Sequence, residues 1–181
     1  MIYLFLAEGF EECEALAPLD ILRRAEIDIK TIGIGAKRIT GSHGIEVTAD
    51  LSEDEVRLDS ALSGIILPGG MPGTLNLEKN STVQNAVDYC AENSLLISAI
   101  CAAPLILGHK NLLNGKKATC FTGFEKELLG AECIDVPVVC DGNIITGYGA
   151  GAAFDFGFKI LEYLKNKETA DTLSQQMRYT K

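Results

Sequence analysis

The chain has 181 residues, of which 47% are hydrophobic, and this is enough apolar material for the core of a single domain over residues 1–181. Its formal net charge of −9 disfavours nucleic acid as a partner, because the phosphate backbone is bound by basic surfaces. Since no apolar run approaches the roughly 18 residues of a membrane-spanning helix, no membrane partner is expected either.

Short apolar runs alternate with helical patterns along the chain. The patterns predict strands over residues 2–7, 27–34, 64–67, 95–100 and 118–121, helices over 11–25, 81–93, 124–129, 152–166 and 168–179, and hairpins over 37–49 and 136–146. Apolar strands separated by helices favour a flavodoxin-like α/β sandwich of three layers, with a mostly parallel central sheet. Ligands of such sheets bind beyond the carboxyl ends of the strands.

Cys101 lies at one of these strand ends, between the predicted strand 95–100 and a segment that begins a helix with Pro104. A sharp turn at this point predicts a nucleophile elbow, with the sulfur directed at orphan N–H groups of the helix start. A thiol in that position should ionise more easily than a free cysteine. The alternative is a buried structural cysteine, since free cysteines are commonly buried.

Two further segments reach the same edge of the sheet. Glu14 lies about one turn into the first helix, and a carboxyl close to a thiolate tends to stay protonated. The turn at residues 68–70 could direct the N–H of Gly70, together with that of Ala102, toward a developing oxyanion. The other acidic residues at 8, 11 and 12 are assigned to the helix dipole.

Six cysteines without a C-x-x-C pair indicate no zinc or thioredoxin-type motif, and they fit a reducing cytoplasm with most of the six in the core. Cys120 is such a core candidate, with a resolving thiol as the alternative. His43 is predicted to be a solvated turn residue and His109 to lie too far along its helix to activate Cys101. Neither histidine has partners at metal-ligand spacing, so no metal is expected.

Five stretches, taken in order, resemble the ThiJ/PfpI superfamily: AEGFEECEA at 7–15, PLDILRRA at 18–25, LPGG at 67–70, AICAAP at 99–104 and GAGA at 149–152. The resemblance runs through essentially the whole chain. It is strongest to the branch of the human parkinsonism-associated protein deglycase and bacterial YajL.

This resemblance implies a homodimer in which Cys101 is the reactive cysteine and Glu14 its protonated partner, with the N–H groups of Gly70 and Ala102 lining the site. It implies a cofactor-independent enzyme of the glyoxalase III or deglycase type, acting on small reactive aldehydes such as methylglyoxal and glyoxal or on glycated adducts. The alternative that it implies is a non-enzymatic oxidative-stress sensor or chaperone, working through oxidation of Cys101 to a sulfinate.

Two departures from the family pattern bear on activity. Phe121 stands where the human relative has a histidine, as it does in YajL, so any glyoxalase activity is expected to be slow. Ala102 stands where the protease-like members have a histidine directly after the nucleophile, and peptidase activity is therefore not expected.

Overall fold

A central sheet organises the molecule, and the computed structural model describes residues 1–179 of it. Residues 180 and 181, which the expected domain range includes, lie outside the described part. The strands of this sheet are β1 (Ile2–Leu6), β2 (Ile29–Gly33), β5 (Leu51–Ser52), β6 (Gly64–Leu67), β7 (Leu96–Ile100), β10 (Val138–Asp141) and β11 (Ile144–Gly147). They follow the order β10-β11-β7-β6-β1-β2-β5, and only the pair β10–β11 is antiparallel. The predicted mostly parallel sheet is confirmed.

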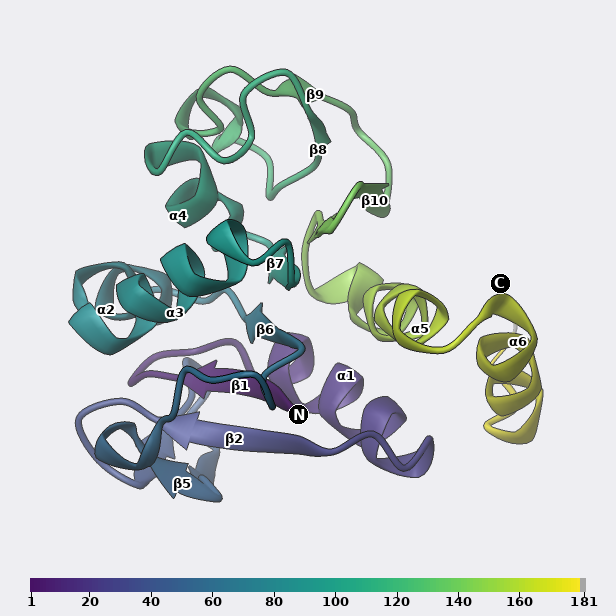
Figure 1. Ribbon diagram of the computed structural model, residues 1–181, viewed down its shortest axis with the longest axis horizontal. Helices are drawn as coiled ribbons and strands as arrows, with labels where there is room; N and C mark the ends of the chain where they lie inside the picture. The colour runs from purple at the N-terminus through teal and green to yellow at the C-terminus, as the bar shows by residue number, and fades with distance from the viewer. Residues whose placement is uncertain (180–181) are drawn as a thin grey trace.

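Helices cover both faces of the sheet (Figure 1). One face carries α2 (Gly73–Lys79), α3 (Ser81–Glu92) and α4 (Pro104–His109), and the other carries α1 (Glu12–Arg24), α5 (Ala153–Leu164) and α6 (Lys167–Gln176). Because side chains alternate along a strand, Tyr3 and Phe5 of β1 enter one core cluster, whereas Leu4 and Leu6 enter the other. This is the expected three-layer sandwich. No helix in the described part is long and apolar enough to cross a membrane.

The position of α1 is fixed by close packing against α5. A Cβ added to Gly157 of α5 would lie 2.7 Å from Ile21 Cδ1 and 2.9 Å from Pro18 Cα. Only glycine allows the two helices to approach to this distance. The contact holds the helix whose first turn carries Glu14.

The smaller elements differ in part from the predictions. The hairpin predicted over 37–49 is present as β3 (Arg38–Thr40) and β4 (Glu46–Thr48). The strand predicted over 118–121 is only β8 (Lys117–Ala118), which pairs with β9 (Glu132–Cys133) outside the main sheet. The helix predicted over 124–129 is a single 3₁₀ turn, η2 (Glu125–Glu127), and two further such turns are η1 (Glu53–Glu55) and η3 (Ala150–Ala152). Helix α2 was not predicted, because it is one of the short helices and begins in a Pro-Gly run typical of loops.

Candidate active site

Cys101 directly follows β7 and has a left-handed backbone conformation, with φ of +64°. This conformation costs a residue other than glycine roughly 1–2 kcal/mol, so it needs support from its surroundings. The N–H of Cys101 donates to the carbonyl of Gly147 at 2.9 Å, and its own carbonyl accepts from the N–H of Phe121 at 2.8 Å. The sharp strand-to-helix turn predicted at Cys101 is therefore present.

Glu14 extends from the first turn of α1 into the interior, and its side chain is 0% exposed. Its Oε2 accepts a hydrogen bond from the N–H of Gly69 at 2.9 Å. The other oxygen, Oε1, is buried and meets no donor in hydrogen-bond geometry. Burial raises the pKa of Glu14 to about 7, with the negative charge of Glu11 adding to this rise and the Cys101 thiol and the Gly69 N–H opposing it. The carboxyl can therefore hold or release a proton near neutral pH.

The sulfur of Cys101 lies close enough to Glu14 for each group to change the pKa of the other. Burial first, and then the Glu14 carboxylate, raise the pKa of the thiol to about 12, against a smaller lowering by the N–H groups of Ala102 and Gly70. The predicted easy ionisation of Cys101 is thus wrong, because burial of the sulfur and the neighbouring Glu14 carboxylate both disfavour the thiolate. The two groups titrate as one coupled pair.

All four residues predicted for the site come together in the structure. The side chains of Glu14 and Cys101 interact, and the N–H groups of Gly70 and Ala102 face the Cys101 sulfur. The turn predicted at residues 68–70 does bring its backbone to the same place. The two backbone donors of the site, Gly70 and Ala102, thus come from two loops that are distant in sequence.

Gly69 is the residue that the sequence analysis missed. A Cβ at this position would lie 2.6 Å from Glu14 Oε2 and 2.7 Å from Cys101 Cβ, so a larger residue would separate the pair. Its neighbour Gly70 has φ of +89°, a conformation that favours glycine. The Gly-Gly pair was the available signal, but sequence alone did not distinguish it from an ordinary turn.

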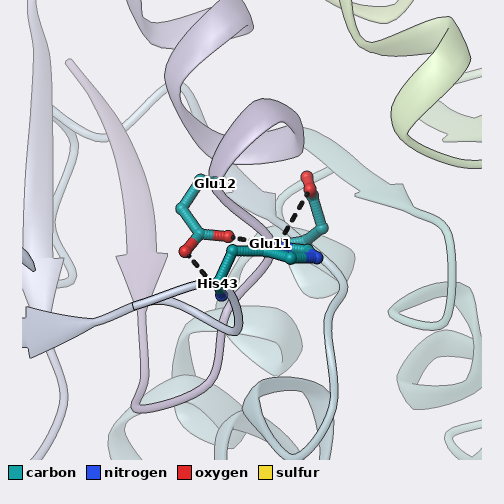
Figure 2. A group of neighbouring side chains, drawn as sticks. All are labelled: Glu11, Glu12 and His43. Carbon is teal, nitrogen blue, oxygen red and sulfur yellow. Dashed lines mark hydrogen bonds and ion pairs between the residues drawn. The ribbon is translucent and has the colours of Figure 1, made fainter. Parts of the chain in front are cut away.

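A second polar cluster lies beside this pair, at the start of α1 (Figure 2). The buried carboxylate of Glu12 accepts from the N–H of His43 at 2.8 Å, and its Oε2 lies 2.9 Å from Nδ1 of the same histidine. Burial alone would raise the pKa of Glu12, but the hydrogen bonds from His43 and from backbone N–H groups outweigh it and lower this pKa to about 2. Glu12 therefore fastens the β3–β4 loop to α1, instead of serving only the helix dipole. His43 has an exposed ring, as predicted, yet it is paired with a carboxylate 31 positions away.

Glu11, Glu12 and His43 also form the one group of possible metal-ligand atoms found in the described part of the chain, with these atoms within 4.8 Å of one another. Sequence spacing could not show this group, because the tertiary fold brings the loop to the helix. The Glu12 oxygens already accept hydrogen bonds from the side chain of Ser42 and from the backbone of the same loop. The ion pair between His43 and Glu12, together with these hydrogen bonds, accounts for the arrangement of the three side chains.

The second histidine and the remaining cysteines lie outside this site. His109 joins Glu78 Oε1 at 2.5 Å and Glu127 Oε2 at 2.9 Å, and so ties α2 to η2. Cys120 is buried in the core, as expected. The expectation that most cysteines are buried is wrong, however, since Cys13, Cys133 and Cys140 are exposed. A small thiol tolerates both environments, and spacing alone does not separate them.

An open pocket of about 280 Å³ lies next to the Cys101 turn. Its lining consists of Cys120, Phe121, Thr122, Tyr148, Gly149, Ala150 and Gly151. The Phe121 side chain is 51% exposed there, and its backbone N–H is the donor to the Cys101 carbonyl. The Cys101 and Glu14 side chains are not among the lining residues, so the pocket is joined to the Cys101 turn through this backbone hydrogen bond.

Comparison with known proteins identifies relatives of this chain. Protein DJ-1 homolog A of Arabidopsis thaliana is 35% identical over 173 residues, which are 93% of this chain but only 44% of that longer protein. Protein dj-1beta of Drosophila melanogaster is 33% identical over 173 residues, covering 94% of this chain and 92% of that protein. Its crystal structure has a TM-score of 0.93, with 30% identity, 99% of this chain and 98% of that chain covered.

A third similar protein is the oxidized DJ-1 of Toxoplasma gondii, with a TM-score of 0.90, 28% identity, and coverage of 99% of this chain and 98% of that chain. Residues 1–163 match the model of the DJ-1/PfpI family. The chain therefore belongs to the DJ-1/PfpI family, the ThiJ/PfpI group that its motifs resemble.

Proposed function

We propose that this protein is a cofactor-independent reactive-cysteine enzyme that converts small reactive aldehydes, methylglyoxal and glyoxal, into hydroxy acids. The observation that carries the proposal is the buried contact between Glu14 and Cys101, in which a carboxyl with a pKa of about 7 lies beside a thiol. Glu14 would supply the proton transfer that an aldehyde isomerisation requires, and Cys101 would supply the nucleophile.

The first step is attack of the Cys101 sulfur on the aldehyde carbon. The reactive form is the thiolate, which burial disfavours, so in this mechanism Glu14 would keep its proton and donate a hydrogen bond to the sulfur as the thiolate forms. A carbon–sulfur bond forms and the carbonyl π bond breaks, which leaves the charge on oxygen. The N–H groups of Gly70 and Ala102, which face the Cys101 sulfur, would stabilise that alkoxide, or the hemithioacetal after protonation.

The second step moves hydrogen between the two carbons. Glu14, as the carboxylate, removes the proton from the carbon bonded to sulfur, and the resulting enediol accepts a proton on the neighbouring carbon. A thioester of Cys101 results. Water then cleaves the carbon–sulfur bond, which releases lactate from methylglyoxal or glycolate from glyoxal and restores the thiol. One molecule of water is consumed and no net oxidation or reduction takes place.

The same nucleophile could open the hemithioacetals or aminals that methylglyoxal forms with other molecules, so glycated adducts are a second substrate class of this proposal. The pocket of about 280 Å³ beside Cys101 is open and admits a free aldehyde or an adduct presented on a small molecule. Competition between a free aldehyde and an adduct at equal concentration separates the two.

One comparison favours a second candidate function. The similar Toxoplasma gondii protein was crystallised in an oxidized form. If Cys101 is oxidised by peroxide to a sulfinate, Glu14 would be a hydrogen-bond donor to it, and the protein would act as an oxidative-stress sensor. In that function Glu14→Gln changes the oxidation end point and no turnover is lost.

Two further parts of the proposal concern the cellular form. We place the enzyme in a reducing cytoplasm, which is supported by six cysteines that are all free thiols. We also propose a homodimer, which is supported by the family and by large apolar side chains exposed on the single chain, among them Ile45, Phe121 and Phe154.

The test is the appearance of lactate from methylglyoxal with purified, reduced protein, followed by NMR spectroscopy. Turnover that depends on Cys101 supports the enzyme. A rate equal to that of Cys101→Ala would reject it, and peroxide titration of Cys101 by mass spectrometry would then test the sensor.

A further inference from the structure

His43 lies on the β3–β4 loop and reaches the first turn of α1. Its Nδ1 lies 2.9 Å from Glu12 Oε2 and 3.8 Å from Glu11 Oε1, and Ser42 Oγ is 3.1 Å from the same nitrogen (Figure 2). The backbone of the loop donates to Glu12 as well, from His43 and Ile45. The imidazole is therefore held beside two carboxylates, although 70% of its side chain is exposed.

One of these two carboxylates, that of Glu11, connects directly to Glu14. Glu11 Oε2 caps the helix by accepting from the Glu14 N–H at 2.8 Å. The N–H of Glu11 donates to the Gly69 carbonyl at 2.9 Å, and the N–H of Gly69 in turn donates to Glu14 Oε2 at 2.9 Å. The turn that holds His43 is thus the turn that positions the buried carboxyl.

The influence of His43 on Glu14 is electrostatic, so it requires no movement of the backbone. Despite its burial, the hydrogen bonds that Glu12 accepts lower its pKa to about 2, and the charge of Glu11 is one of the influences that raise the pKa of Glu14. A proton on His43 adds a positive charge within 4 Å of both Glu11 and Glu12. It therefore offsets the negative field that favours the protonated form of Glu14.

We propose that His43 is a positioning residue of the active site, whose positive charge offsets the negative charge of Glu11 and so sets the proton affinity of Glu14. This role rests on the proposed function, in which Glu14 transfers the proton. The groups that face the His43 ring are Glu12 and Glu11 from α1 and the Ser42 hydroxyl from its own loop.

The sign of the effect follows from the charges. The Glu12 carboxylate raises the pKa of His43 above its usual value, so the imidazolium is present at low pH and is lost as the pH rises through this raised pKa. Loss of that positive charge strengthens the hold of Glu14 on its proton. The Glu14 titration is therefore spread over a wider pH range than that of an isolated carboxyl.

The experiment compares His43→Gln, which has no charge, with His43→Lys, whose charge is permanent. The readout is the infrared absorption of the protonated Glu14 carboxyl as a function of pH, assigned by its absence in Glu14→Gln. We expect the midpoint in His43→Lys to lie below that in His43→Gln by about 0.3 to 1 pH unit, which Coulomb's law gives for one charge across roughly 10 Å at effective dielectric constants between about 80 and 20. The unmodified protein should titrate more broadly than either variant.

His109 provides the matched control, because it also pairs with two glutamates but is not bonded to the α1 turn. His109→Gln and His109→Lys should leave the Glu14 midpoint unchanged. Equal midpoints in the two His43 variants, or an equal shift in the His109 pair, would overturn the inference. The readout does not depend on aldehyde turnover, so a protein without lactate formation can still show the shift, and an active enzyme can still lack it.

Discussion

Gly69 holds Glu14 through its N–H and leaves space for it through its missing side chain. The N–H donates to Glu14 Oε2 at 2.9 Å, and a Cβ on Gly69 would lie 2.6 Å from that oxygen and 2.7 Å from Cys101 Cβ. The coupled thiol and carboxyl therefore depend on a residue that has no functional group of its own.

The first prediction is that Gly69→Ala separates the pair. We expect a loss of roughly 1–3 kcal/mol in the free energy of unfolding, as is usual for overpacking a filled interior, together with a changed pH profile for alkylation of Cys101. Peptide-resolved mass spectrometry measures that profile despite the other thiols. Gly151→Ala is the control, since the nearest atom to its added Cβ is 3.8 Å away. An unchanged profile in Gly69→Ala would show that the loop does not hold the pair.

The second prediction concerns stability and pH. The pKa of Glu14 is about 7 in the folded protein, against 4.5 for an unperturbed glutamate. Because the folded state binds this proton more tightly, its contribution to stability is complete below pH 4.5 and is lost as the pH rises through about 7. The loss is on the order of 3 kcal/mol and is absent from Glu14→Gln.

Urea unfolding of both proteins at about pH 5, 6, 7 and 8, which bracket the titration of Glu14, measures this difference in the free energy of unfolding. The stability of the variant relative to the unmodified protein should increase toward pH 8. Parallel pH profiles would mean that Glu14 is ionised in the fold at all these values.

The layers of the fold were predictable from the sequence because each depends on local patterns. The run 96–100 is apolar and short, and it ends at Cys101, so both the strand and the turn after it followed from its composition. Glu14 was predictable as a partner because one helical turn separates it from the loop after β1. The family motifs strengthened these assignments.

The rest depended on contacts between distant segments. The pairing of His43 with Glu12 spans 31 positions, and nothing near either residue indicates it. The raised pKa of Cys101 depends on burial and on Glu14, and the helix start alone predicted a change in the opposite direction. Short elements such as α2 were missed because tertiary packing, and not propensity, stabilises them.

The third prediction is that Phe121→His accelerates aldehyde conversion. The Phe121 side chain is half exposed and lines the open pocket, and its backbone N–H is bonded to the Cys101 carbonyl, so we expect an imidazole at this position to act on an aldehyde held by Cys101. General acid–base catalysis typically contributes about 10²–10⁴-fold, and we expect a gain in kcat near the lower value. Phe121→Leu should give no gain. An unchanged kcat in Phe121→His would place the reacting carbon elsewhere in the site.

The fourth prediction concerns assembly. Sedimentation equilibrium should give twice the chain mass of 19.4 kDa, because the exposed Phe154 and Ile45 side chains are expected to be covered in a homodimer. Charged substitutions at these two positions should shift the mass toward one chain. A single-chain mass for the unmodified protein at micromolar concentration would contradict the dimer.

The most direct test of the account is the rate of lactate formation from methylglyoxal in four proteins: unmodified, Cys101→Ala, Glu14→Gln and the double variant. Two groups that act as one unit are non-additive, so each single change should reduce kcat to about the same level as both together. That result would establish the coupled thiol and carboxyl as the catalytic unit. A Glu14→Gln protein that retains full turnover, or an unmodified protein no faster than Cys101→Ala, would contradict the mechanism.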